Sequence, residues 1–170
     1  MIVQTSRFGA VEVDQERVIT FSRGILGFPK YKNYILIHPE ETAAGGSEAT
    51  FYWLQSLDVA DLAFVVTDPL LFIPDYQIPL REESRAELGL ADLSEANVLV
   101  IVNKVGDTLT ANLQGPLVIH ATTRAAAQIV ISEKKYQTRH PIMQLQRTAA
   151  VGTTKAASAG QAQQYVSKSA

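Results

Sequence analysis

Short apolar segments, separated by polar turn-forming residues, recur along the first 131 residues of the chain. They are rich in Val, Ile and aromatic side chains, and most are followed by Gly, Pro or Asp. Such residues favour strands, and runs this short favour strands over helices, so the pattern predicts a series of short strands. The predicted strands cover residues 34–37, 51–55, 62–67, 98–102, 117–119 and 128–131. The 98–102 run is the longest β-branched one, and we expect it to be the most buried.

One hairpin and one helix can be assigned around these strands. Apolar residues within 11–13 and 18–21 flank the polar residues 14–17, which predicts a hairpin with a four-residue loop. Residues 80–88 have a helix-forming composition and end at Gly89, which predicts a short surface helix. Helical crossovers are missing between most strands, which favours antiparallel pairing. The predicted fold is therefore mostly β, a small antiparallel β-barrel-like single domain with one short surface helix.

The chain divides into one domain and a tail. Its 170 residues suit a single domain, and 46% apolar with 19% charged residues is a globular composition. From Thr148 onward the sequence has no acid, no proline and too few large apolar groups to offset the entropy of ordering. We expect the barrel domain at 1–147, a disordered low-complexity tail at 148–170, and a flexible loop at 40–48.

Composition also bears on location and partners. The chain has no cysteine, no apolar stretch long enough to span a membrane and no signal-peptide pattern, which predicts a cytoplasmic protein without membrane contact. Residues 1–123 carry 8 Lys and Arg against 16 Asp and Glu, and residues 124–170 carry 7 against 1. A net charge of −8 in the first part would attract basic partners and repel nucleic acid. The alternative is that the acids only form a solvated surface.

No catalytic constellation is recognisable in the sequence. The G-x-S-x-G, G-x-x-x-x-G-K-[ST] and G-x-G-x-x-G motifs are all absent. His38, His120 and His140 lie far apart, so a shared metal site is not predicted. Carboxylate pairs such as Asp68 with Asp75 lie beside prolines and turns, where aspartates usually cap backbone amides. We therefore expect neither enzyme activity, nor a metal, nor a cofactor.

The segment 68–76 differs from the rest because it is mostly apolar and yet contains two prolines. Pro69 and Pro74 cannot donate to a strand ladder, so the segment belongs at an edge or in a surface excursion. Apolar groups that stay exposed there, beside Asp68 and Asp75, would suit a protein partner. The alternative is that the segment folds back as a lid on one end of the barrel, and both interpretations remain open.

Several sequence blocks, taken in order, resemble the FliW family of flagellar assembly factors. The blocks are Phe8-Gly9, 19–21, 24–28, 51–56, 62–69, Pro74-Asp75-Tyr76, 110–116, Gln128 and 136–141. Together they cover residues 1–143. The chain departs from the family at Leu26, where a proline is common, and in the 21–24 turn, which lacks an expected proline and acid.

The resemblance implies a β-barrel-like domain that binds two proteins, flagellin and the translational regulator CsrA, in a mutually exclusive way. Such a protein would relieve CsrA repression of flagellin translation and act on flagellin like a chaperone. It would be a cytoplasmic monomer when free and would not touch nucleic acid directly. An acidic domain that meets a basic RNA-binding protein would also gain electrostatic steering.

Six residues are candidate partner contacts, four from the proline-bounded segment and two from the aromatic strand before it. They are Asp68, Phe72, Asp75, Tyr76, Trp53 and Gln55. If the segment is exposed, Phe72→Ala together with Tyr76→Ala should weaken partner binding and leave the melting temperature nearly unchanged.

Two other function classes stay open. A flavin-binding β-barrel enzyme is the first, since split barrels can bind flavin without any short motif, and absorbance of the purified protein would reveal it. A direct nucleic-acid binder is the second, and the acidic charge of residues 1–123 disfavours it.

Overall fold

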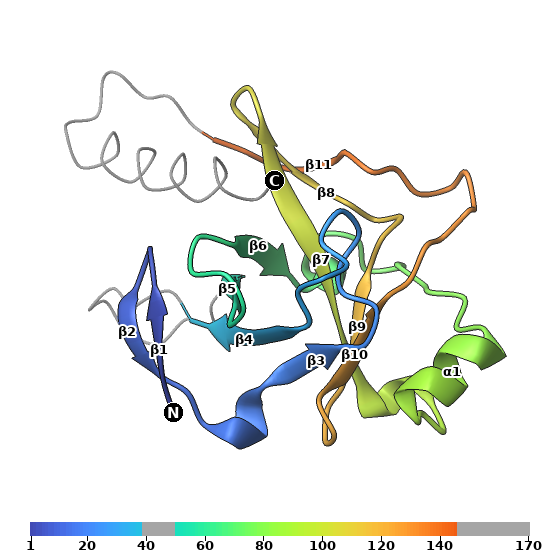
Figure 1. Ribbon diagram of the computed structural model, residues 1–170. Helices are drawn as coiled ribbons and strands as arrows, with labels where there is room; N and C mark the ends of the chain where they lie inside the picture. Colours follow the sequence, from blue (N-terminus) through green and yellow to red (C-terminus); the bar gives the residue numbers. More distant parts are fainter. Residues whose placement is uncertain (39–49, 146–170) are drawn as a thin grey trace, which may run out of the picture.

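The computed structural model describes residues 1–38 and 50–145, which form eleven strands, one α-helix and three 3₁₀ turns (Figure 1). The strands are β1 (Ile2–Thr5), β2 (Gly9–Glu12), β3 (Ile19–Phe21), β4 (Asn33–Ile37), β5 (Phe51–Ser56), β6 (Ala63–Thr67), β7 (Ala96–Val105), β8 (Thr108–Ala111), β9 (Leu117–His120), β10 (Ala125–Gln128) and β11 (His140–Gln144). The helical elements are η1 (Gln15–Arg17), η2 (Pro69–Leu71), α1 (Glu82–Leu88) and η3 (Leu93–Glu95). The predicted loop at 40–48 and tail at 148–170 lie outside the described residues, and so does the end of the predicted 1–147 domain.

Strand β7 closes the barrel because it is long enough to pair with three other strands. Along one edge its residues 100–102 pair with β6. Along the other edge residues 96–99 pair with β9 and residues 102–105 pair with β8. Within the described residues, β7-β6-β5-β4-β3-β10-β9 therefore form a closed barrel of seven strands, and β8 and β11 extend the sheet beyond it. The prediction of a mostly β, barrel-like fold is confirmed.

Two pairings differ from the predicted antiparallel hairpins. Strand β3 runs parallel to β10, with Thr20 opposite Ala125. Strand β2 pairs with β1 and not with β3, so the hairpin predicted over 11–21 is wrong. The reason is local, because the Asp14 side chain accepts a hydrogen bond from the Glu16 backbone N–H at 3.1 Å and starts the 3₁₀ turn η1. The chain thus leaves the two-stranded β1–β2 sheet and enters the barrel.

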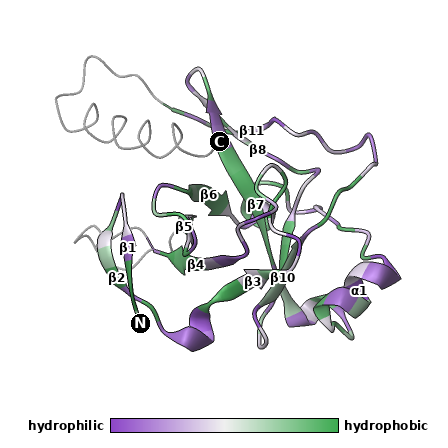
Figure 2. Ribbon diagram, viewed as in Figure 1, coloured by the Kyte–Doolittle hydropathy of each residue, from purple (hydrophilic) through white to green (hydrophobic). Residues whose placement is uncertain are grey.

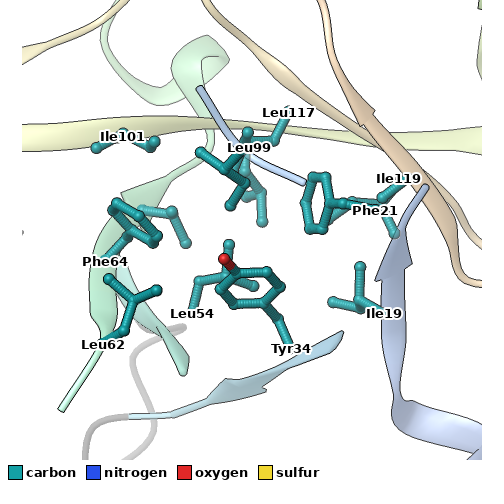
Figure 3. Close-up of a cluster of buried hydrophobic side chains, with 13 residues drawn as sticks. Ile19, Phe21, Tyr34, Leu54, Leu62, Phe64, Leu99, Ile101, Leu117 and Ile119 are labelled. Atoms are coloured by element: carbon teal, nitrogen blue, oxygen red, sulfur yellow. The ribbon is translucent and has the colours of Figure 1, made fainter. Parts of the chain in front are cut away.

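The main apolar core fills the interior of the barrel, because every barrel strand contributes a side chain to it. Tyr34, Leu54 and Phe64 lie across the interior from Leu99 of β7 (Figure 3). The Tyr34 ring meets the ring of Phe21 edge to face, with centroids 5.4 Å apart. Burial of Tyr34 raises the pKa of its hydroxyl to about 12. That hydroxyl has no hydrogen-bond partner among the described residues.

The outer face of the barrel wall is covered as well. Side-chain alternation places Trp53, Val65 and Val102 on the face opposite the interior, where Phe8 and Ile142 pack on them. The central strands are therefore apolar on both faces, as the green colour of β7 in Figure 2 shows. Burial on both faces explains why these strands are continuous apolar runs without polar alternation.

The predicted helix is confirmed as α1, which lies outside the barrel and packs against β10 (Figure 1). It ends at Gly89, whose φ of 65° is the left-handed conformation that glycine adopts without strain. The Leu90 backbone N–H then donates to the Arg85 carbonyl at 2.9 Å. Leu88 and Leu90 are buried against Val118 of the barrel wall.

Candidate partner-binding groove

The proline-bounded segment begins as a capped turn. The Asp68 side chain accepts a hydrogen bond from the Leu70 backbone N–H at 2.9 Å, and Pro69 occupies the first position of η2. The backbone N–H groups of Phe72 and Ile73 both donate to the Pro69 carbonyl. Proline has no N–H for a ladder, so strand β6 ends here and the chain turns outward.

The turn leaves two leucines in solvent. Leu70 is 53% exposed and Leu71 is 59% exposed, whereas Pro69 beneath them is buried. The next residue, Phe72, is half-buried and stacks on Phe51 of β5 at a centroid distance of 6.1 Å. The segment therefore does expose apolar groups, but its most exposed ones are two leucines that were not among the six candidates.

Tyr76, in contrast, belongs to the core. It is 7% exposed, and its hydroxyl donates to the Leu113 carbonyl at 2.6 Å. Its ring meets the ring of Tyr136 at 4.7 Å, and burial raises the pKa of the Tyr76 hydroxyl. The Tyr136 hydroxyl in turn accepts a hydrogen bond from the Gln77 backbone N–H at 2.9 Å. The interpretation of Tyr76 as an exposed contact is therefore wrong, and we expect its replacement to lower stability because this side chain anchors the segment to the barrel wall.

The two candidates from β5 are also buried. Trp53 is 3% exposed. Its ring meets the Phe8 ring edge to face, and the central carbon of the Arg7 guanidinium lies 4.0 Å from its ring centroid. Gln55 is fully buried, and its amide nitrogen lies 3.0–3.4 Å from four backbone carbonyls between Ser56 and Leu62. Both side chains hold the fold together, and of the six candidates only Asp68, Phe72 and Asp75 reach the surface.

A groove of about 770 Å³ lies directly beside this segment. Its lining combines both ends of the segment, the end of β4, the start of β5, η3 and the first half of β7. The lining residues are Leu36, His38, Tyr52, Asp68, Pro69, Leu70, Tyr76, Gln77, Ile78, Leu93, Ala96, Asn97, Val98 and Leu99. Most are apolar, and a few polar groups converge on them, which is the usual composition of a binding site.

The charge around the groove is one-sided. Asp68 is the only Asp, Glu, Lys or Arg in the described lining. Residues 68–78 and 92–99, which supply most of the lining, carry four Asp and Glu and no Lys or Arg. Of these acids, Asp75, Asp92 and Glu95 are exposed and flank lining residues in the sequence. The groove therefore combines an apolar floor with an acidic surrounding, and its local charge favours a basic partner.

Two negative findings concern the described residues alone. Within 1–38 and 50–145, no group of three His, Cys, Asp or Glu side chains is arranged to hold a metal ion. In the same ranges, no helix has the length and apolarity needed to cross a membrane.

The closed barrel and its acid-rimmed apolar groove define a small β-barrel protein with the kind of site that binds part of another protein. A family model described as FliW protein matches residues 2–142. The chain belongs to the FliW family of flagellar assembly factors, so the resemblance found in its sequence is confirmed.

Individual relatives agree with this family. The chain is 37% identical over 146 residues to the "Flagellar assembly factor FliW" of Alkaliphilus metalliredigens. The aligned residues cover 85% of this chain and 87% of that protein. The protein of the same name from Geotalea uraniireducens is 40% identical over 147 residues, with 85% of each chain covered. A solved structure, "Crystal structure of the flagellar assembly factor FliW", superimposes with a TM-score of 0.74 at 28% identity, over 84% of this chain and 97% of that one.

Proposed function

We propose that this flagellar assembly factor works by binding flagellin and CsrA one at a time. A chain occupied by flagellin could not restrain CsrA, so repression of flagellin translation would follow the amount of free flagellin. The bound protein would also cover apolar surface of flagellin, as a chaperone does. The observation that supports a binding role is the groove, whose lining is apolar and whose charged surroundings are acidic.

The physical argument for CsrA rests on charge. RNA-binding proteins carry basic surfaces that neutralise phosphates, and an acidic groove steers such a surface toward itself. An acidic protein bound beside the RNA site would also place negative potential against the RNA backbone. Direct nucleic-acid binding by this chain is disfavoured by the same charge. In this scheme the protein is a cytoplasmic monomer when it is free.

Light scattering on a sizing column tests the proposal. The purified protein is mixed with CsrA at low and at high salt, and flagellin is then added to the preformed complex. We expect a stable complex that weakens at high salt and loses CsrA when flagellin is added. Separate elution of the two proteins at both salts would refute the CsrA part, and a ternary complex would refute mutual exclusion.

The competing hypothesis of a flavin-type barrel enzyme has its own readout. It predicts visible absorbance of the protein as purified, or uptake of added flavin with a change in the fluorescence of Trp53, the single tryptophan of the chain. Neither result is expected if the chain acts through protein partners alone.

A further inference from the structure

We infer that the groove beside η2 binds a partner segment in which an apolar side chain stands close to a Lys or Arg. This inference rests on the proposed function and specifies what the groove recognises. The apolar side chain would enter the groove, and the cation would meet the carboxylate of Asp68 at its rim.

The apolar half of the inference comes from incomplete burial. Leu36, Ile78 and Val98 line the groove and are only half-buried, although all three belong to or flank apolar clusters. Leu70, also in the lining, stays 53% exposed. An apolar side chain seated among these four would remove their remaining surface from water, which is favourable in proportion to the area covered.

The cationic half comes from Asp68. One of its carboxylate oxygens accepts the Leu70 backbone N–H, and a carboxylate has further acceptor sites for a second donor. Among the described residues Asp68 has no ion-pair partner, and no Lys or Arg lines the groove beside it. Its half-buried position limits solvent screening, so a Lys or Arg from outside would gain more here than at an open surface.

The same charge argues against a second copy of the chain as the occupant. Asp75, Asp92 and Glu95 are exposed and adjoin lining residues in the sequence, so two facing copies would bring like charges together. Residues 146–170 carry three Lys and Arg and no acid, so they share the chemistry of the inferred ligand. For that reason a peptide of these residues is included in the test.

Two matched pairs of variants separate the groove from its neighbourhood. Leu70→Ala removes a lining side chain, whereas Leu71→Ala removes an equally exposed leucine of the same turn that is not in the lining. Asp68→Asn removes the rim charge and keeps the cap, since asparagine also accepts the Leu70 N–H. Glu16→Gln removes an exposed charge of η1, outside the lining.

Dissociation constants are measured with CsrA, with flagellin, and with an 18-residue helical peptide that carries leucines on one face and lysines on the other. A leucine–glutamate peptide of the same design serves as the negative probe. We expect Leu70→Ala and Asp68→Asn each to weaken binding about tenfold, with Leu71→Ala and Glu16→Gln within about twofold of the parent. The Asp68→Asn effect should shrink at high salt, whereas the Leu70→Ala effect should not.

The possible outcomes distinguish the groove inference from the proposed function. If the parent binds CsrA or flagellin and all four variants bind alike, the groove inference is overturned and the proposed function stands. If neither protein binds but the leucine–lysine peptide binds with the expected variant pattern, the proposed function fails and the groove inference stands. No binding of any probe overturns both. A Leu70-dependent dimer, or a 146–170 peptide that binds more tightly than the partners, would overturn the choice of occupant in favour of the chain itself.

Discussion

Removal of one oxygen atom, in Tyr76→Phe, tests how the groove segment is held. The Tyr76 hydroxyl donates to the Leu113 carbonyl at 2.6 Å inside the wall cluster that includes Tyr136. In the variant the ring still fits, but the buried Leu113 carbonyl loses this donor. Leaving a buried polar group unsatisfied costs about 1–3 kcal/mol. We therefore expect the free energy of unfolding to fall by about that amount, which is a large share of the stability of a typical domain.

Urea unfolding followed by tryptophan fluorescence measures this loss, since the single tryptophan, Trp53, is buried in the barrel wall. The midpoint should fall while the slope with urea stays constant, because the folded state buries the same surface. Tyr31→Phe is the matched control, because Tyr31 is half-buried and its hydroxyl makes no hydrogen bond to another described residue. That variant should change stability by less than about 0.5 kcal/mol.

Partner binding separates the anchoring role of Tyr76 from a contact role. We expect the folded Tyr76→Phe protein to bind within about twofold of the parent, since its hydroxyl points into the wall and not into solvent. A variant of unchanged stability that no longer binds its partner would refute this reasoning and support the surface role that the sequence suggested.

Three further predictions concern the barrel. Gly24→Ala should lower the free energy of unfolding by more than about 3 kcal/mol, because the new Cβ would lie 2.5 Å from the Phe28 carbonyl oxygen. Gly106 has a similar positive φ, but a Cβ there meets no atom within 4 Å, so Gly106→Ala should cost about 1–2 kcal/mol. Urea unfolding measures both. At pH 7, Tyr34→Phe should raise the free energy of unfolding, by up to about 1–3 kcal/mol, because it removes a buried hydroxyl that has no hydrogen-bond partner among the described residues. Burial raises the folded pKa of Tyr34 to about 12, so the parent protein keeps its full stability below pH 10 and loses stability as the pH rises toward 12. The variant lacks this hydroxyl and should lose less stability over that range, as measured by an unfolding series against pH. Gln55→Leu should cost about 2–3 kcal/mol by the same urea assay, since the carbonyls it joins lose their shared donor; an unchanged midpoint would refute that role.

The strands that the sequence predicts well are those buried on both faces. The 98–102 run lies inside β7, and the 62–67 run is β6 with Leu62 before it. Interior and outer clusters bury the apolar side chains of both runs, and Thr67 is their only polar residue. The strand predicted at 128–131 lies too far along the chain, because β10 spans Ala125–Gln128. Ile129 and Ile131 are buried, but their N–H groups donate to the carbonyls of loop residues and not to a strand. The apolar pattern therefore predicts which residues are buried in the barrel wall, but not which of them pair as a strand.

Pairing between strands was less predictable because it depends on distant segments. Strands β1 and β11 consist of mixed residues with little apolar signal, and they form only through pairing with β2 and β8. The parallel contact of β3 with β10 joins residues about one hundred positions apart, and no local turn encodes it. Local turn chemistry, in contrast, was readable, as Gly89 at the end of α1 shows.

The site segment was predicted in part for a related reason. Two prolines indicated that residues 68–76 leave the sheet, and they do. Composition could not tell which apolar side chain faces the wall, because that depends on the partner each one finds there. Tyr76 finds the Leu113 carbonyl and Tyr136, whereas Leu70 and Leu71 lie on a capped turn that holds them away from the wall.

The double burial of the wall also restricts where this protein can recognise anything. A barrel with one solvent face can bind through side chains on its strands, but here the central strands have apolar clusters on both sides. We therefore expect recognition where the wall is interrupted and side chains of the neighbouring strands stay accessible. Beside η2 the ladder stops at a proline, and Leu70 and Asp68 reach the surface above half-buried Val98. The proline that ends strand pairing at this segment therefore also leaves a groove in which apolar and acidic groups lie side by side.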